Sequence, residues 1–184
     1  MSDAHLFPKT ERLRANAVKR PFFVVLVEPE IPPNTGNIAR LCGATCCPLH
    51  LVGQLGFRID EHAVRRAGLD YWHLVEVHQH ANWQQCETTL TQYRDPGQPG
   101  RSWFFTGRAR RSLYEADILP GDALVFGKES VGLPHELLDS HPDSLLAIPT
   151  LGAVRSLNLA NAVSIALFEA LRRNGLLDVS YDEG

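Results

Sequence analysis

Apolar runs alternate with helical repeats along most of the chain. The run Phe22–Val27 is continuous, rich in β-branched residues and ended by Glu28-Pro29, which is typical of a strand buried on both faces. Beyond it the sequence predicts helices at about 36–46, 61–67, 83–93 and 156–173, and strands at about 49–52, 74–77, 103–106, 123–126 and 145–148. Strands that alternate with helices predict an α/β fold, a mostly parallel sheet flanked by helices.

The last predicted helix is apolar on nearly every side. Leucine, isoleucine, valine, alanine and phenylalanine occupy positions all round the segment 157–171, so no single face holds them. Such a helix is buried on more than one side. The sheet covers one side, and a second copy of the chain is the natural cover for another, which predicts a homodimer. Burial within a single chain is the alternative.

Length and composition indicate one domain. The chain has 184 residues, of which 44% are hydrophobic, enough for one sizeable core. We expect an N-terminal extension at 1–20, a single domain at 21–177 and a short tail at 178–184. The first twenty residues lack the apolar stretch of a signal peptide, and no apolar run is long enough to span a membrane. The sequence therefore predicts a cytoplasmic protein with no membrane partner.

Charge and cysteine content narrow the candidate chemistry. Lys and Arg number 18 against 21 Asp and Glu, so the net charge is -3 and nucleic-acid binding needs local basic patches. Free thiols are favoured over a zinc site, because no Cys-x-x-Cys pair occurs among the cysteines, which are Cys42, Cys46, Cys47 and Cys86. His78 and His80 lack a third ligand in the sequence pattern, so we expect them on the surface and expect no metal.

The loop after the first strand carries polar groups into the next helix. Asn34 and Thr35 stand at the helix entry, and Arg40 lies about one turn inside it among apolar residues. Ligands in open α/β sheets bind beyond the carboxyl ends of the strands, so this loop is a candidate site. Helix capping by Asn34 or Thr35 is the alternative. Arg40 suits a phosphate or carboxylate ligand, with an ion pair to Glu28 or Glu30 as the alternative.

Two further loops follow predicted strands. The segment Gly127–Pro134 holds two glycines, which allow a close backbone approach or a positive φ. Ser156, Asn158 and Asn161 stand at the start of the apolar last helix, where free N–H groups and the helix dipole favour electron-rich ligands. An N-cap formed by Ser156 is the alternative. All three loops are candidates for one shared site.

Three motifs, taken in order, resemble those of the SPOUT class of RNA methyltransferases, specifically its SpoU-like branch that methylates ribose. They are Asn34-Thr-Gly-Asn-Ile-Ala-Arg40, Leu124-Val-Phe-Gly-Lys-Glu-Ser-Val-Gly-Leu-Pro134, and Ile148-Pro149 continuing through Ser156–Val163. Within this branch the chain is similar to the small tRNA (cytidine/uridine) 2′-O-methyltransferases that act at the anticodon wobble position. That similarity rests on Glu28–Asn37 and Arg65–Tyr71, and the whole resemblance covers about residues 21–177.

The resemblance implies a C-terminal trefoil knot, an obligate homodimer and S-adenosyl-L-methionine as the methyl donor. The product would be S-adenosyl-L-homocysteine, and no metal is expected. Backbone groups of the knot loops hold the cofactor in such enzymes. Carried over to this sequence, these positions are Thr106, Gly127, Ile148, Ser156 and Leu157.

By the same resemblance, Arg40 is the key catalytic residue. Its guanidinium is normally protonated, which favours orientation of phosphate and hydroxyl over removal of a proton. Ser156, Asn158 and Asn34 complete the polar cluster, with Glu129 supporting it on the substrate side. The partner is tRNA, and a surface of the dimer binds it; the basic candidates are Arg12, Arg14, Lys19, Arg20 and Arg108–Arg111, with Arg108 and Arg110 foremost.

The sequence departs from its relatives at three places. These are the 20-residue extension, the segment Thr106–Arg110, and Phe168, where a tyrosine is often found. The departures leave the reaction class intact and the choice of RNA open. The alternatives are a ribosomal RNA 2′-O-methyltransferase, a catalytically silent RNA-binding dimer and a nicotinamide-binding oxidoreductase. The joint presence of Arg40, Ser156 and Asn158 counts against the silent dimer.

Overall fold

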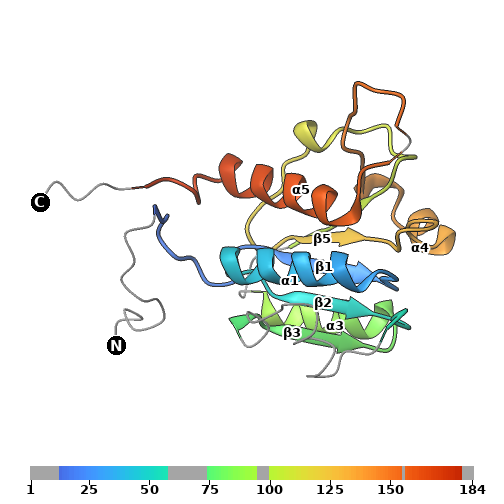
Figure 1. Cartoon of the computed structure of the whole chain (residues 1–184), viewed down its shortest axis with the longest axis horizontal. Helices are drawn as coiled ribbons and strands as arrows, with labels where there is room; N and C mark the ends of the chain where they lie inside the picture. The colour runs from blue at the N-terminus through green and yellow to red at the C-terminus, as the bar shows by residue number, and fades with distance from the viewer. Residues whose placement is uncertain (1–12, 58–73, 95–99, 155, 180–184) are drawn as a thin grey trace, which may run out of the picture.

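Six parallel strands form one sheet. The computed structural model describes residues 13–57, 74–94, 100–154 and 156–179. Within these residues the strands are β1 (Phe23–Val27), β2 (Leu49–Val52), β3 (Val77–His80), β4 (Ser102–Phe105), β5 (Ala123–Phe126) and β6 (Leu145–Leu146). Every pairing among them is parallel, in the order β3-β2-β1-β5-β4-β6 (Figure 1). The predicted α/β fold is confirmed.

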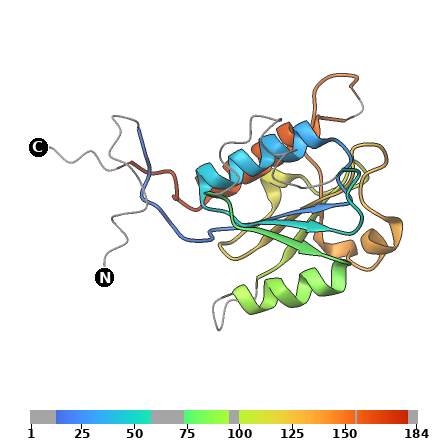
Figure 2. The ribbon, with the colours of Figure 1, turned by 60° about the horizontal axis from the view of Figure 1, so that its bottom comes forward.

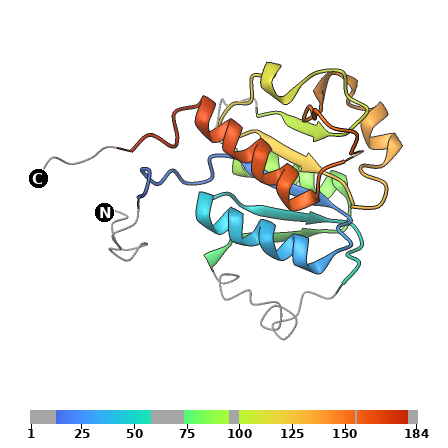
Figure 3. The same ribbon diagram turned by 45° about the horizontal axis from the view of Figure 1, so that its top comes forward.

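Helices cover both faces of this sheet. They are α1 (Pro32–Thr45), α3 (Trp83–Tyr93), α4 (His135–Asp139) and α5 (Leu159–Arg173), with the short 3-10 turns η2 (Leu113–Glu115) and η3 (Pro142–Ser144). α3 lies on one face (Figure 2), whereas α1 and α5 lie side by side on the other (Figure 3). No helix in the described ranges is long and apolar enough to cross a membrane. The helix predicted at 61–67 lies outside the described residues.

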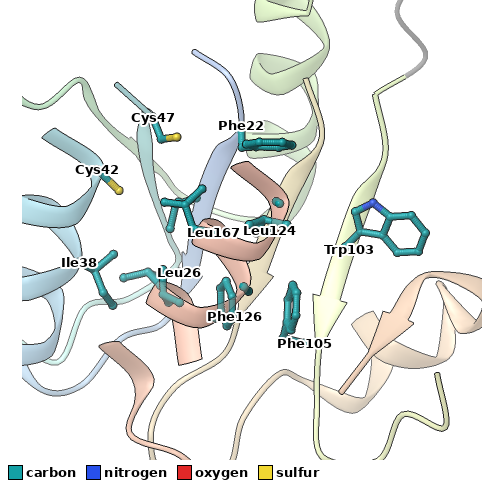
Figure 4. Packing of buried hydrophobic residues seen from close by; sticks show 14 of the residues in the cluster. Phe22, Leu26, Ile38, Cys42, Cys47, Trp103, Phe105, Leu124, Phe126 and Leu167 are labelled. Carbon is teal, nitrogen blue, oxygen red and sulfur yellow. The ribbon is translucent and has the colours of Figure 1, made fainter. Parts of the chain in front are cut away.

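Alternate side chains of β1 enter two separate core clusters. Leu26 packs with residues of α1 and α5, whereas Val25 packs with residues of α3. Because both faces are covered, the strand needs apolar residues at every position, as its sequence shows. Figure 4 shows the first cluster, in which the rings of Phe105 and Phe126 stack with centroids 4.5 Å apart and Leu167 of α5 lies nearby. The four cysteines are free thiols, as predicted.

α1 begins earlier than predicted. It starts at Pro32 rather than near Gly36, with prolines at its first positions. Proline fits there because its fixed φ suits a helix and its missing N–H has no intrahelical acceptor to lose. The N-cap residue is Ile31, and no side chain caps the helix. The alternative of a cap formed by Asn34 or Thr35 is therefore wrong, because both residues lie within the first turn.

Other boundaries also differ from the prediction. β3 occupies Val77–His80 instead of 74–77, because the structure pairs His78 beside His50 of β2 rather than pairing the preceding apolar residues. His80 is buried near α3, so its predicted surface position is wrong. α5 begins at Leu159 instead of near Ser156, and β6 ends after two residues.

Candidate active site

The candidate site lies where the winding of the sheet reverses. From β1 the chain builds outward through β2 and β3, and it then crosses to the other side to add β4, β5 and β6. All six strands are parallel, so the loops that follow β1, β5 and β6 emerge at one edge of the sheet (Figure 1). Ligands of open α/β sheets bind at such a reversal, beyond the carboxyl ends of the strands.

The Glu129 carboxylate joins the loop after β5 to the loop after β1. Its Oε2 accepts a hydrogen bond from the backbone N–H of Glu30 at 2.9 Å, and its Oε1 accepts from the N–H of Ile31 at 3.3 Å. Oε1 also accepts from Nδ2 of Asn34 at 2.9 Å. Hydrogen bonds to an ionised acceptor are among the stronger ones in proteins. Glu129 therefore fixes the entry of α1 against the end of β5.

Two further contacts hold the same pair of loops together. Lys128 Nζ lies 2.8 Å from Oε2 of Glu28, a bond that raises the pKa of Lys128. The backbone N–H of Ser130 donates to Oε2 of Glu30 at 3.1 Å. Glu28 has a φ of 49°, in the left-handed region that a residue other than glycine seldom adopts. Both carboxylates, which were candidate partners of Arg40, therefore contact the loop after β5.

Asn34 extends the network to the third segment. Its Oδ1 accepts a hydrogen bond from Nδ2 of Asn158 at 3.0 Å. Asn158 is also the N-cap of α5, since its Oδ1 accepts from the N–H of Ala160 at 2.9 Å and from that of Asn161 at 3.4 Å. The alternative of an N-cap formed by Ser156 is wrong, because Asn158 takes that position. Glu129, Asn34 and Asn158 thus connect the three predicted motifs, and we call them the polar chain.

Both glycines of the loop after β5 meet a structural need. A Cβ at Gly127 would collide with the carbonyl carbon of Gly132 and the nitrogen of Leu133, so no larger residue fits. Gly132 has a φ of 79°, and its N–H donates to the carbonyl of Lys128 at 2.9 Å. The tight turn brings the loop back on itself. The close approach at Gly127 is therefore to the chain's own backbone.

The predicted cofactor positions gather at the carboxyl edge of β4, β5 and β6. Thr106 follows β4, where its N–H donates to the carbonyl of Leu146 at 2.9 Å. Gly127 follows β5, and Ile148 comes two residues after β6. Ser156 and Leu157 are exposed on the approach to α5. The fold thus places all five positions at strand ends or at one helix entry.

Arg40 lies on the exposed face of α1. It shares that face with Pro33 and Asn37, whereas Asn34 and Ile38 are buried. The structure therefore unites Asn34, Asn158 and Glu129 in one series of hydrogen bonds, and it places Arg40 on the outer surface of the same helix.

The basic positions after β4 are also exposed. Nη1 of Arg108 lies 2.8 Å from Nδ1 of His135, at the start of α4, and Arg110 is exposed beside it in the chain. Prediction from the sequence missed the contributions of Glu30 and Lys128 to the loop contacts. The sequence signal for these contacts was the run Gly127-Lys128-Glu129, because it places two charged side chains directly after a buried strand, at the edge where ligands bind.

This geometry defines an α/β protein with a ligand site built from loops at the sheet's point of reversal. The chain belongs to the SpoU rRNA methylase family, which it matches over residues 21–168. The predicted family is thereby confirmed. The knot and the homodimer implied by the resemblance stay predictions.

Near relatives extend over most of the chain. The tRNA (cytidine(34)-2'-O)-methyltransferase of Acidovorax sp. (strain JS42) is 47% identical over 157 residues, which is 85% of this chain and 94% of the relative. One solved structure concerns the 2-OH methylation of C/U34 on tRNA. It is 43% identical to this chain with a TM-score of 0.74, and the match covers 83% of this chain and 95% of that chain. The AdoMet-bound rRNA methyltransferase from Sinorhizobium meliloti has a TM-score of 0.65 and 27% identity, covering 88% and 59%.

Replacement of Glu129 by alanine should release the loop after β1. The amides of Glu30 and Ile31 then lose a charged acceptor, and each such bond contributes about 1.5–3 kcal/mol. We expect their hydrogen exchange to quicken by about tenfold or more, measured by NMR or by mass spectrometry of short peptides. Glu129→Gln, which keeps one acceptor oxygen, should show a smaller change.

The matched control is Glu87→Ala, which removes an exposed carboxylate on α3 at the other face of the sheet. It should leave exchange at 29–35 unchanged. Equal exchange in wild type and Glu129→Ala would show that this carboxylate does not hold the loop.

Proposed function

We propose that the chain transfers a methyl group from S-adenosyl-L-methionine to the ribose 2′-hydroxyl of the wobble pyrimidine of tRNA, in the cytoplasm. The observation that carries this proposal is the 47% identity to a tRNA (cytidine(34)-2'-O)-methyltransferase across 94% of that relative. The polar chain supports it, because it assembles three distant motifs at the edge of the sheet where a ligand binds.

The loops after β4, β5 and β6 suit the cofactor. The segment between β6 and α5 exposes three apolar side chains, those of Leu151, Val154 and Leu157. Exposed apolar groups beside polar loop backbone are typical of a ligand groove, and they match the flat apolar face of an adenine base. Thr106, Gly127 and Ile148 would hold the cofactor through their backbone groups. When bound, S-adenosyl-L-methionine supplies the methyl group as an electrophile.

The remaining site residues divide into two roles. Arg40, exposed and cationic, would orient a phosphate of the RNA and stabilise negative charge on the 2′-oxygen as its proton leaves. Asn158 donates to Asn34, and Asn34 donates to Glu129, which favours a positioning role in which the two amides fix α1 relative to α5. Ser156, exposed just before α5, is free of such a structural bond in the described ranges and is available to a ligand.

The basic segment after β4 is a candidate tRNA contact. Arg108 and Arg110 are exposed and follow the same strand as Thr106, so they flank the proposed cofactor loops. Phosphate contacts by arginine position RNA without reading its sequence. A local basic segment of this kind can bind RNA although the whole chain is slightly acidic.

A homodimer completes the proposal. The inner side of α5 is buried, but Ala162 and Ile165 are only partly buried and Phe168 is 45% exposed on the outer side. An apolar stripe that one chain leaves uncovered is a typical interface between copies. The dimer would also offer a wider surface to tRNA than a single small domain can.

The function is tested directly by methyl transfer from labelled S-adenosyl-L-methionine to unmodified and natively modified tRNA. Nuclease digestion and mass spectrometry of the fragments then locate the product. We expect a 2′-O-methylated cytidine or uridine at position 34. Methylation of ribosomal RNA in place of tRNA would contradict the substrate, and methylation of a base would contradict the reaction.

Arg40→Ala should abolish methylation while the affinity for S-adenosyl-L-methionine stays within about twofold of wild type. Loss of one preorganised charged group at a reacting centre lowers turnover by about a hundredfold to a thousandfold. The control is Arg101→Ala, which removes an exposed arginine at the amino end of β4, on the opposite edge of the sheet. Turnover at the wild-type rate in Arg40→Ala would rule out the catalytic role.

Phe168→Glu should convert the dimer to a monomer, because an unpaired carboxylate within an apolar interface costs several kcal/mol. Light scattering coupled to size exclusion measures the mass. Leu119→Glu, at an equally exposed apolar position before β5, should leave the dimer intact. A wild-type protein that runs as a monomer at micromolar concentration would refute the predicted interface.

A further inference from the structure

A second polar cluster lies between β2, β3 and α3. His50 of β2 and His80 of β3 face each other, with Nδ1 of His50 2.9 Å from Nε2 of His80. Their rings are nearly parallel, with centroids 5.1 Å apart. The thiol of Cys86 on α3 closes the group, and one ligand atom from each of the three side chains lies within 4.8 Å of the others.

The cluster is buried, and only some of its polar atoms have hydrogen-bond partners. His50 and Cys86 have no solvent exposure, and His80 is 6% exposed. The hydrogen bond between the rings occupies one nitrogen of His50, while its Nε2 is buried without a hydrogen-bond partner among the described residues. Buried polar atoms in proteins are rarely left in this state, and each such atom calls for an explanation.

His78 belongs to the surroundings of the cluster. It stacks on His50 with centroids 4.7 Å apart, but its Nε2 lies 3.0 Å from Oε1 of Glu76. The same carboxylate is bound by Arg20, whose Nη2 lies 2.7 Å from Oε1. These contacts hold the rim of the cluster in place and leave three side chains directed at one another.

We propose that His50, His80 and Cys86 form a binding site for one thiophilic transition-metal ion, of which Zn²⁺ is the representative. Two imidazoles and one thiolate are a ligand set that suits zinc, cobalt and copper, and three protein ligands leave a fourth position for water or another donor. Magnesium and calcium prefer oxygen ligands and are disfavoured here.

The spacing of the donors is close to what such an ion requires. Tetrahedral Zn²⁺ with nitrogens at about 2.0–2.1 Å places two nitrogen ligands roughly 3.3 Å apart. The two facing ring nitrogens lie 2.9 Å apart, so they separate by a few tenths of an ångström and turn their lone pairs toward the ion. The three donor atoms lie within 4.8 Å of one another, so the thiol also moves inward when the ion binds. In this step the proton between the two facing nitrogens moves through solvent to the other nitrogen of the same ring, and the two nitrogens that it leaves unprotonated form the metal–nitrogen bonds.

The thiol must lose its proton when the ion binds. Burial raises the pKa of Cys86 to about 12, so the thiol is protonated in the metal-free protein. Binding forms the metal–sulfur bond and releases that proton to solvent. Of the three proposed ligands, His80 also borders a cavity of about 240 Å³.

Titration of the full-length protein with Co²⁺ tests the site. The protein is first stripped with a chelator, and the absorption of a cobalt–thiolate charge-transfer band in the near ultraviolet is then followed. We expect the band to saturate at one ion per chain and to disappear when Zn²⁺ displaces the cobalt. Absence of the band, or cobalt binding without it, would overturn the proposal by excluding the cysteine as a ligand.

Matched variants locate the ligands. Cys86→Ser should abolish the band, and His80→Gln should weaken cobalt binding by at least about tenfold. Cys42→Ser removes a thiol that is equally buried but lies in the opposite core cluster, so it should bind cobalt as wild type does. A band that persists in Cys86→Ser would overturn the site.

Thermal unfolding provides a second measurement, which does not depend on the cobalt band. Zn²⁺ that binds the folded chain selectively should raise the unfolding midpoint of wild type and of Cys42→Ser. If Cys86→Ser does not fold, His80→Gln tests the site instead, because His80 is the most exposed of the three side chains. This variant should lose most of the rise. An equal rise in wild type and His80→Gln would refute the assignment.

Discussion

The site depends on one carboxylate, that of Glu129. It joins the loops that follow β5 and β1, the two neighbouring strands at the centre of the sheet. β1 and β5 are neighbours, but their loops lead to helices on opposite faces, and the strands alone do not set the distance between those loops. Glu129 sets it by accepting two backbone N–H groups and the amide of Asn34. Asn34 in turn holds Asn158 at the N-cap of α5. Glu129 and the bond between Asn34 and Asn158 therefore connect three segments that are far apart in sequence.

Much of the fold could be predicted from the sequence, because the composition of the central strands fits few other kinds of secondary structure. β1 and β5 are short apolar runs, and burial on both faces demands that composition. Errors occurred where local patterns compete with tertiary structure. Pro32 and Pro33 lie in the segment that was predicted as a loop, although prolines serve equally well in the first turn of a helix such as α1. β3 was misplaced because its inward positions are histidines, and only the neighbouring histidine on β2 explains why polar rings are buried there.

The site was predictable as a region and less so in its contacts. Parallel strands bring their carboxyl ends to one edge, so Asn34, Glu129 and Asn158 could be assigned to one place. Which of two polar residues caps α5 depends on backbone angles that the sequence does not specify, and Asn158 rather than Ser156 has the required geometry. The His50, His80 and Cys86 cluster had no sequence signature, because its members come from three elements and meet only through strand register and the position of α3.

In the proposed function, the loops after β4, β5 and β6 form one cofactor site on this framework. Hydrogen exchange of the wild-type protein, with and without saturating S-adenosyl-L-methionine, is the measurement that tests this site. We expect slower exchange at 106–108, 127–133 and 148–158, with little change in β2, β3 and α3. Unchanged exchange in those loops despite cofactor binding, or protection centred on β2 and β3, would contradict it.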